Sequence, residues 1–305
     1  MKNGILRAKP IMTLRRDHLD SLAISLLLVC CLFWGFQQVL IKATLPWVPP
    51  MVQGCARFIG ATVLLMLWCA WRRIPLWERD GSLRAGLLAG LLFALEFVCI
   101  YPGMQYTTAS RLTIMLYTAP FWVAVLIPIW IKHERLRPLQ WLGLATAFCG
   151  VAFALRDSLT SGGSWLGDAL SLAAGALWGL TTVVLRTTAL SRVSAEKLLF
   201  YQVGVSAVLL PLVALGMGES FTLDYSAWGW TSLLVQASLG AFVTFLIWMW
   251  IISHYPATRV SAFSFLSPLS ALMFGALWLA EPITSDLMIA LVGVALGIYL
   301  VNRRG

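Results

Sequence analysis

Ten runs of mostly apolar residues divide the chain, and each is about as long as a helix that crosses a bilayer, roughly 20 residues. A helix suits such a run because it satisfies its own backbone hydrogen bonds where water is absent. Only 11% of the residues are charged and 60% are hydrophobic, whereas soluble domains have about 25% and roughly 45–50%. The chain is therefore predicted to be an all-α integral membrane protein. The runs are residues 19–41, 50–71, 84–106, 110–131, 138–155, 165–185, 196–216, 227–253, 257–279 and 285–301.

Basic residues concentrate in alternate loops. Eighteen of the 22 Lys and Arg residues lie in the two tails and in the loops on their side, whereas Lys42, Arg111 and Arg156 lie on the other side and Arg57 lies inside a run. Because Lys and Arg are enriched in cytoplasmic loops, both termini are expected in the cytoplasm. The net charge of +9 then reflects membrane topology, with lipid as the expected surroundings and no nucleic acid as a partner.

The sequence contains no residue pattern typical of an enzyme, a metal centre or a cofactor site. All six cysteines fall inside apolar runs, without the spacing of metal ligands or of a disulfide framework. His133 and Glu134 begin an HExxH motif, but Arg137 stands where its second histidine is required. No phosphate-binding loop is present, which argues against direct drive by ATP. We expect a protein that is not an enzyme and that uses no cofactor and no metal.

The second half of the sequence repeats the first. The segment LFWGFQQVLIKATL at residues 32–45 returns as ALWGLTTVVLRTTAL at residues 176–190. Trp34 thereby matches Trp178, and Lys42 matches Arg186. A second pair of segments, residues 106–120 and 255–268, places Pro120 opposite Pro268, and Glu134 after the fourth run is mirrored by Glu281 after the ninth.

The repeat unit contains five spans, which is an odd number, so the second copy must cross the membrane in the opposite direction. Such inverted-topology repeats are the hallmark of secondary transporters. The expected organisation is a cytoplasmic tail at 1–18, a first five-helix repeat at 19–155, an external linker at 156–164, a second repeat at 165–301 and a cytoplasmic tail at 302–305.

This order of motifs resembles the EamA family of the drug/metabolite transporter superfamily, over nearly the whole chain. The resemblance implies ten helices in two inverted five-helix repeats, alternating access, and a cavity surrounded by helices 1, 3, 4, 6, 8 and 9. Within the family, the segment FALEFVCIYPG at 93–103 is similar to the YddG-type exporters of aromatic and other neutral amino acids. That likeness implies the inner membrane of a bacterium as the location.

Pro120 and Pro268 occupy matching places within their runs. A proline inside a helix removes one backbone N–H and frees a carbonyl group, which a polar ligand can satisfy. We expect both prolines to act as hinges at the substrate site, and a simple packing kink is the alternative. Tyr117 and Ser264, three and four residues earlier, share the faces of these prolines and are expected to bind substrate.

The first helix of each repeat carries polar residues at mid-membrane depth. Trp34 and Gln38 share one face of the first run, and Trp178 and Thr182 are their counterparts. Such polar groups serve either interhelical hydrogen bonding or a polar cavity, and we expect them to bind substrate. Aromatic walls for a ring or an ammonium group are expected from three further residues, with contact to lipid as the alternative. These are Tyr101, Phe245 and Trp248.

Glu96 is the carboxylate that lies well inside a run. An ionisable residue at this depth is a candidate functional group. Its two expected roles are to bind the ammonium group of a substrate or to carry a coupling proton. A static ion pair with Arg57, at similar depth in the neighbouring run, is the structural alternative.

The sequence thus predicts a secondary transporter that exports small metabolites across the cytoplasmic membrane. Aromatic and other neutral amino acids are the favoured substrates. Cationic drugs, sugars and nucleotides are the other substrate classes, and a channel or a membrane scaffold is the remaining alternative. The polar residues cluster at mid-depth instead of following a continuous face, which favours a carrier over a channel.

Overall fold

The computed structural model describes residues 16, 18–107, 109–156, 164–222, 224–279 and 285–303. Within these ranges every regular element is a helix, which confirms the predicted all-α fold. Among the described residues, eight helical stretches are long and apolar enough to cross a membrane, and two shorter apolar helices lie at Pro138–Ala154 and Met288–Asn302. Glu281, the expected counterpart of Glu134, lies outside the described residues.

The described helices follow the predicted runs in order. The first repeat contains α1 (Ser21–Thr44), α2 (Pro50–Arg72), α3 (Leu83–Tyr106), α4 (Ala109–Leu116), α5 (Ala119–Trp130), the short η1 (Lys132–Glu134) and α6 (Pro138–Ala154). The second contains α8 (Trp165–Thr187), η2 (Ala189–Arg192), α9 (Ala195–Gly216), α10 (Ala227–Val235), the π-helix η3 (Gln236–Val243), α11 (Thr244–His254), α12 (Ala257–Ala262), η4 (Phe263–Phe265), α13 (Leu266–Leu279) and α14 (Ser285–Asn302).

The fourth span of each repeat is interrupted. We expected a continuous helix over residues 110–131 with Pro120 at its centre, but α4 ends at Leu116 and Pro120 lies in the first turn of α5. A proline is readily accommodated there because the first turn has no hydrogen bond for its missing N–H to make. In the second repeat a 3-10 turn separates α12 from α13, and Pro268 again lies in the first turn of the following helix.

The two repeats interlock, because the first helix of each packs on the fourth span of the other. Helix α1 contacts α13, and α8 contacts α4 and α5. Each contact depends on a glycine: Gly35 lies directly against Ser270, and Gly179 lies directly against Trp122. Both contacted residues follow the matched prolines by two positions, so the two interfaces are equivalent.

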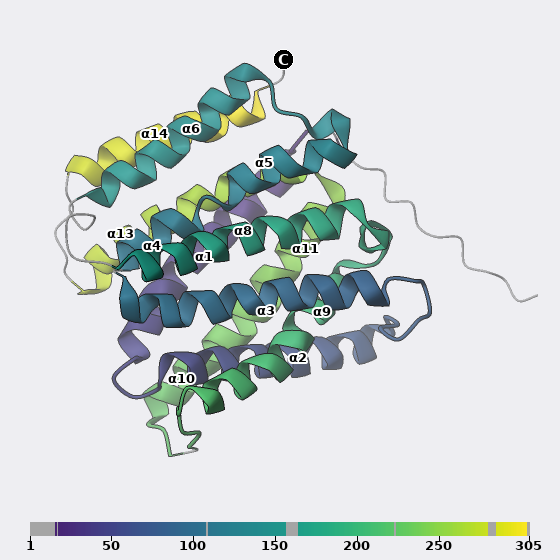
Figure 1. Ribbon diagram of the computed structural model, residues 1–305, viewed down its shortest axis with the longest axis vertical. Coiled ribbons are helices and arrows are strands. Elements are labelled where there is room, and N and C mark those ends of the chain that lie inside the picture. Colours follow the sequence, from purple (N-terminus) through teal and green to yellow (C-terminus); the bar gives the residue numbers. More distant parts are fainter. Residues whose placement is uncertain are drawn as a thin grey trace, which may run out of the picture.

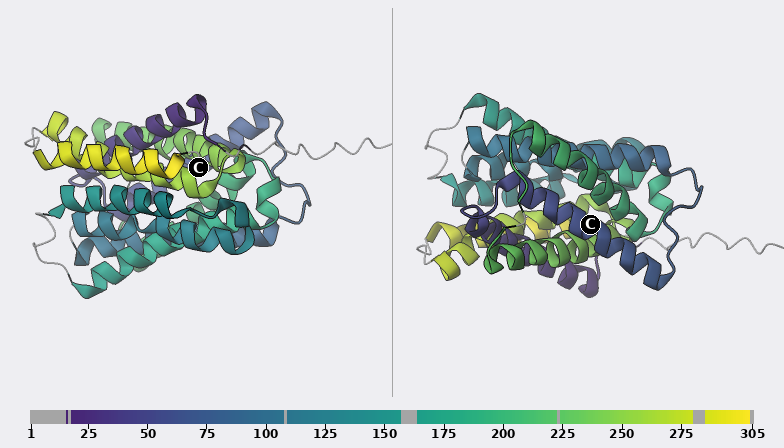
Figure 2. Two further views of the ribbon diagram at one scale, coloured as in Figure 1. Left: turned by 90° about the horizontal axis from the view of Figure 1, so that it is seen from above. Right: turned by 90° about the horizontal axis from the view of Figure 1, so that it is seen from below.

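Helices α6 and α14 form one edge of the molecule, and Figure 1 and the left view of Figure 2 show them side by side. A Cβ atom on Gly143 would lie 2.7 Å from the carbonyl oxygen of Gly297, so the two backbones touch. Helices α2 and α10 lie at the opposite edge. Many large apolar side chains are exposed on the outer surfaces of these helices, as expected of a surface that faces lipid.

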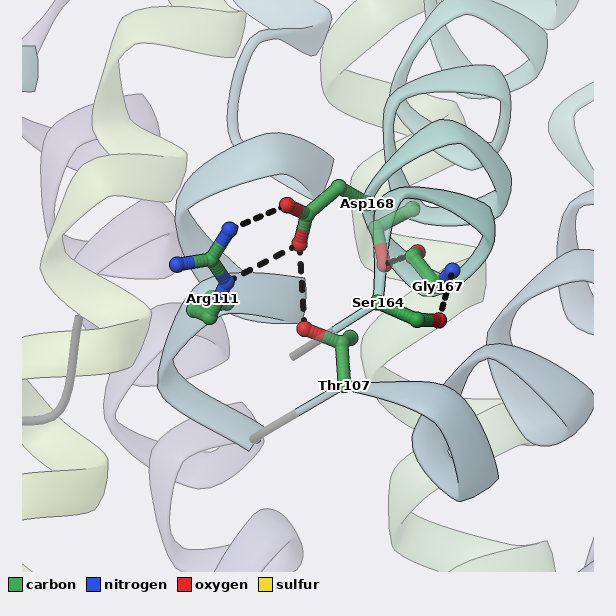
Figure 3. A network of polar contacts seen from close by, with 6 residues as sticks. Thr107, Arg111, Ser164, Gly167 and Asp168 are labelled. Atoms are coloured by element: carbon green, nitrogen blue, oxygen red, sulfur yellow. Dashed lines mark hydrogen bonds and ion pairs between the residues drawn. The ribbon is translucent and has the colours of Figure 1, made fainter. Parts of the chain in front are cut away.

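Polar contacts join the repeats at both ends of the bundle. At the end that carries the α1–α2 connection, called here the Lys42 end, the carboxylate of Asp168 at the start of α8 accepts hydrogen bonds from the Thr107 hydroxyl at 3.0 Å and from Nε of Arg111 at 3.1 Å (Figure 3). At the other end, called here the Arg186 end, Nζ of Lys197 donates to Oδ2 of Asp80 at 2.7 Å.

The Asp80 carboxylate is strongly stabilised in its charged form. Partial burial raises the pKa of this carboxyl, but hydrogen bonds from Lys197 and Ser82 outweigh burial and lower the pKa to about 2. Lys197 also donates to the carbonyl oxygen of Glu78 at 3.0 Å. The α2–α3 connection is therefore fixed on the first turn of α9 by an ion pair that persists at neutral pH.

Candidate functional site

A cavity of about 580 Å³ lies between the two repeats. Its wall comes mainly from α1, α3, α4, α8, α11 and α13, which belong to the six spans that the family resemblance implied. Three further helical segments contribute single residues or pairs: Pro50 and Arg57 from α2, Gln202 from α9 and Leu155 at the end of α6. The aromatic and aliphatic side chains of this wall surround a small number of polar groups, which is typical of small-molecule sites.

The cavity opens at the Lys42 end of the bundle. Lys42 and Leu45 line it there, and both are exposed on the molecular surface. Toward the Arg186 end the lining residues are buried, with Leu185, Gln202 and Met249 at most 5% exposed. The structure therefore has a cavity that is accessible from one side of the bundle and closed on the other.

A buried ion pair closes the Arg186 end. The side chains of Arg186 and Glu134 are 3% and 0% exposed and form an ion pair. Nη1 of Arg186 also donates to the carbonyl oxygen of Ile252 at 3.2 Å, and Oε2 of Glu134 accepts the backbone N–H of Ala257 at 2.8 Å. The pair thereby joins η1 of the first repeat to α8, α11 and α12 of the second.

The structure brings most of the expected substrate-contacting residues together in the cavity wall. Trp34, Gln38, Glu96, Tyr101, Tyr117, Trp178, Thr182, Phe245 and Trp248 all line it, and so does Pro268. They come from six helical spans that are distant in sequence, so the fold alone places them around one space.

Ser264 and Pro120 do not line the cavity, contrary to expectation. Ser264 lies in the 3-10 turn η4, where the α-helical spacing to Pro268 no longer holds. Its buried hydroxyl donates to the carbonyl oxygen of Ser261 at 2.7 Å. Pro120 is buried in the first turn of α5, beyond the interruption at Tyr117 and Thr118.

Aromatic side chains build two sides of the cavity. The Trp34 ring lies 4.9 Å from the ring of Trp248 and 5.6 Å from that of Phe245, measured between centroids. Its indole N–H donates to the hydroxyl of Thr244 at 2.8 Å, which fixes the orientation of the ring. On another side of the cavity, Tyr117 of the first repeat and Trp178 of the second pack edge to face at 5.7 Å. Such walls suit an aromatic or aliphatic side chain.

Arg57 and Glu96 place a guanidinium group and a carboxyl group in the wall. They are 4% and 6% exposed. The alternative expectation of a static ion pair is not met, because the two side chains form no ion pair within the described part of the chain. Nε and Nη2 of Arg57 and Oε2 of Glu96 are buried without a hydrogen-bond partner.

Sequence reasoning missed Gln202. This buried amide on α9 lines the cavity, donates to the carbonyl oxygen of Leu198 at 3.3 Å and contacts the sulfur of Met249 at 3.1 Å. A polar residue inside the apolar run 196–216 was the available signal. This signal was not used because the family resemblance implies a cavity without the seventh helix, on which Gln202 lies.

Family comparison explains the repeated architecture. A model of the EamA-like transporter family matches residues 21–156 and then matches residues 165–303. The chain belongs to the EamA-like transporter family. The double match confirms the two repeats, and family membership makes this EamA-like protein a multi-pass membrane transporter.

Curated relatives cover almost the full length of this EamA-like transporter. The uncharacterized transporter YoaV of Bacillus subtilis is 25% identical over 273 residues, covering 88% of this chain and 92% of the relative. A probable amino-acid metabolite efflux pump of Escherichia coli is 25% identical over 285 residues, covering 90% and 93%. A solved crystal structure shares the fold with a TM-score of 0.77 at 16% identity, covering 94% of this chain and 100% of the other.

Proposed function

We propose that this transporter exports aromatic and other neutral amino acids across the cytoplasmic membrane of a bacterium by alternating access. The observation that carries the proposal is the cavity itself, which combines aromatic walls with two buried ionisable groups, Arg57 and Glu96. An aromatic amino acid has both features, a ring and two charges. The relative described as a probable amino-acid metabolite efflux pump and the YddG-like segment 93–103 give further support.

The proposed cycle starts from an orientation with both termini in the cytoplasm, which the distribution of basic residues favours. The Arg186 end then faces the cytoplasm, and the cavity described above is open to the outside. Loading from the cytoplasm requires the Arg186–Glu134 pair to separate while the Lys42 end closes. In this cycle the interruptions next to Pro120 and Pro268 act as hinges while helix bundles rock about the central cavity.

Glu96 has a second possible use in the same cycle, as the carrier of a coupling proton. A facilitator that follows the amino-acid gradient requires no such group. Transport measured with and without a pH difference across the membrane distinguishes these two modes, because a coupled proton makes the rate of export depend on that difference.

Export from whole cells tests the proposed direction and substrate class. Cells that express the chain are loaded with a phenylalanine-containing dipeptide, which intracellular peptidases convert to free phenylalanine, and the amino acid in the medium is measured over time. We expect faster release than from cells with the empty vector, and growth at dipeptide concentrations that inhibit the control. Equal release, with the protein detected in the membrane fraction, would contradict export of phenylalanine.

A further inference from the structure

We infer that Arg57 binds the carboxylate of the transported molecule while Glu96 binds its ammonium group, so that the cavity recognises the α-amino acid zwitterion. The inference rests on the proposed function and adds the chemical group that each residue reads. It assigns a substrate-binding role to Arg57, which the sequence had offered only as a structural partner of Glu96.

The surroundings of Arg57 hold its guanidinium group in place without satisfying it. The group lies over the rings of Phe58 and Phe97, at 4.6 and 4.8 Å from their centroids. These ring faces attract a cation but accept no ordinary hydrogen bond from it. Nε and Nη2 consequently remain buried without acceptors. Two adjacent N–H groups of a guanidinium form the fork that binds a carboxylate through two parallel hydrogen bonds.

Glu96 supplies the complementary charge from the same wall. It precedes Phe97 on α3 and borders the same cavity as Arg57. Its Oε2 atom is buried and has no hydrogen-bond donor. An ammonium group carries three donors and no acceptor, so it satisfies this oxygen directly. Because an uncompensated buried charge is costly, a ligand with both charges stabilises the site more than a ligand with either one alone.

Aromatic residues connect the charged wall to the ring-lined part of the cavity. Phe97 packs against Phe93 at 5.1 Å, and Phe93 packs against Phe245 at 5.8 Å. Phe245 in turn contacts Trp34. A zwitterion held at Arg57 and Glu96 therefore has its side chain next to an aromatic surface.

Tyr101 fixes the position of this wall relative to α2. A Cβ atom on Gly54 would lie 2.7 Å from the Tyr101 hydroxyl oxygen, so the glycine allows the ring to lie on the helix. Gly54 is one turn before Arg57, and Tyr101 is one turn after Phe97. The close approach of α2 and α3 thus keeps Arg57 and Glu96 at one level of the cavity.

Three molecules with the same phenyl ring separate the two charges in an experiment. Phenylalanine has both, phenethylamine lacks the carboxylate, and 3-phenylpropionate lacks the ammonium group. Each is used to compete with labelled phenylalanine in exchange across the membrane of proteoliposomes. For the unmodified protein we expect phenylalanine to compete about tenfold to hundredfold better than either analogue, since each lost contact is a hydrogen bond to a charged group.

Two substitutions assign each charge to its residue. With Arg57→Gln the advantage of phenylalanine over phenethylamine should disappear, while its advantage over 3-phenylpropionate persists. With Glu96→Gln the advantage of phenylalanine over 3-phenylpropionate should disappear, while its advantage over phenethylamine persists. Arg57→Lys keeps the charge but not the planar fork, so it should restore only part of the carboxylate preference. Because it keeps the buried cation, it remains measurable if Arg57→Gln fails to fold.

Arg72 provides a matched control on the same helix. Its guanidinium also lies over two rings, at 5.6 Å from Trp68 and 5.9 Å from Trp71, but it does not line the cavity. Arg72→Gln should leave all three competition constants unchanged.

An unmodified protein that fails to exchange phenylalanine would contradict the proposed function. If the unmodified protein exchanges phenylalanine but the Arg57 variants still prefer phenylalanine to phenethylamine, the inference about Arg57 is wrong. The proposed function would still stand.

Discussion

At the scale of single residues, a hydrogen bond from another helix sets the orientation of a side chain in the cavity wall. The indole N–H of Trp34 on α1 is bound by the Thr244 hydroxyl at the start of α11. Thr244 itself is buried, at 4% exposed. One hydrogen bond thus sets the orientation of the ring that faces Phe245 and Trp248.

Thr244→Val tests this contact because it keeps the shape of the side chain and removes the acceptor. The indole N–H then loses its protein acceptor, and a hydrogen bond of this kind contributes about 0.5–1.5 kcal/mol. We expect a lower melting temperature in detergent and weaker binding of phenylalanine. Thr187→Val is the control, since among the described residues the Thr187 hydroxyl donates to the carbonyl oxygen of Val183 on its own helix, at 2.8 Å. Equal effects of the two substitutions would contradict a specific role of the Trp34 contact.

At the scale of helices, the interruptions of the fourth spans separate rigid halves. Helices α4 and α5 meet next to Tyr117, whose ring lines the cavity, and the Thr118 hydroxyl donates to the carbonyl oxygen of Met115 at 2.7 Å. The missing N–H of Pro120 prevents the regular hydrogen bond to Leu116 that would continue α4 into α5.

Pro120→Ala should slow transport without weakening binding. The restored N–H can bond to the carbonyl oxygen of Leu116, which extends the helix across the interruption and stiffens it. Because Pro120 does not line the cavity, substrate contacts stay intact. We expect turnover in proteoliposomes to fall several-fold at an unchanged dissociation constant for phenylalanine. Pro128→Ala, two residues before the end of α5, is the control and should preserve turnover. Unchanged turnover of both variants would exclude Pro120 as a hinge.

The elements show which features a sequence encodes locally. Apolar run lengths predicted the spans within a few residues, because burial in lipid demands about 20 apolar residues wherever the span lies. Matched motifs indicated the repeat and a shared role for Trp34 and Trp178, whereas Glu96 was indicated by its charge inside an apolar run, and all three line one cavity. The π-helix η3 and the 3-10 turn at Ser264 were not predicted, because packing between distant helices determines them. For the same reason the ion pair between Arg57 and Glu96, which similar depth in neighbouring runs had suggested, is not formed. The rings of Phe58 and Phe97 hold the guanidinium group instead.

At the scale of the whole molecule, the two ends of the bundle are closed to different degrees. The cavity reaches the surface at the Lys42 end, whereas the Arg186–Glu134 pair lies fully buried at the other. Removing one partner of a buried ion pair leaves an uncompensated charge. This pair should therefore be a main determinant of which state the molecule occupies.

Glu134→Gln should destabilise the described state strongly, by about 3–5 kcal/mol, because Arg186 then remains buried without its counter-charge. Thermal unfolding in detergent measures the effect. Arg16→Gln is the control, since the Arg16–Asp20 pair is solvent-exposed and such pairs contribute about 0–1 kcal/mol. If Glu134→Gln and Arg16→Gln have equal melting temperatures, the buried pair does not hold the Arg186 end closed.

Counterflow at equal pH on both sides of the membrane tests most directly whether this cavity belongs to an amino-acid carrier. Proteoliposomes preloaded with unlabelled phenylalanine are diluted into a trace of labelled phenylalanine. A carrier that alternates between two states should accumulate label transiently above equilibrium, saturably and in competition with other neutral amino acids. Protein-free liposomes provide the baseline. Label that only equilibrates would indicate a pore, and no entry of label into liposomes that contain folded protein would contradict phenylalanine as a substrate.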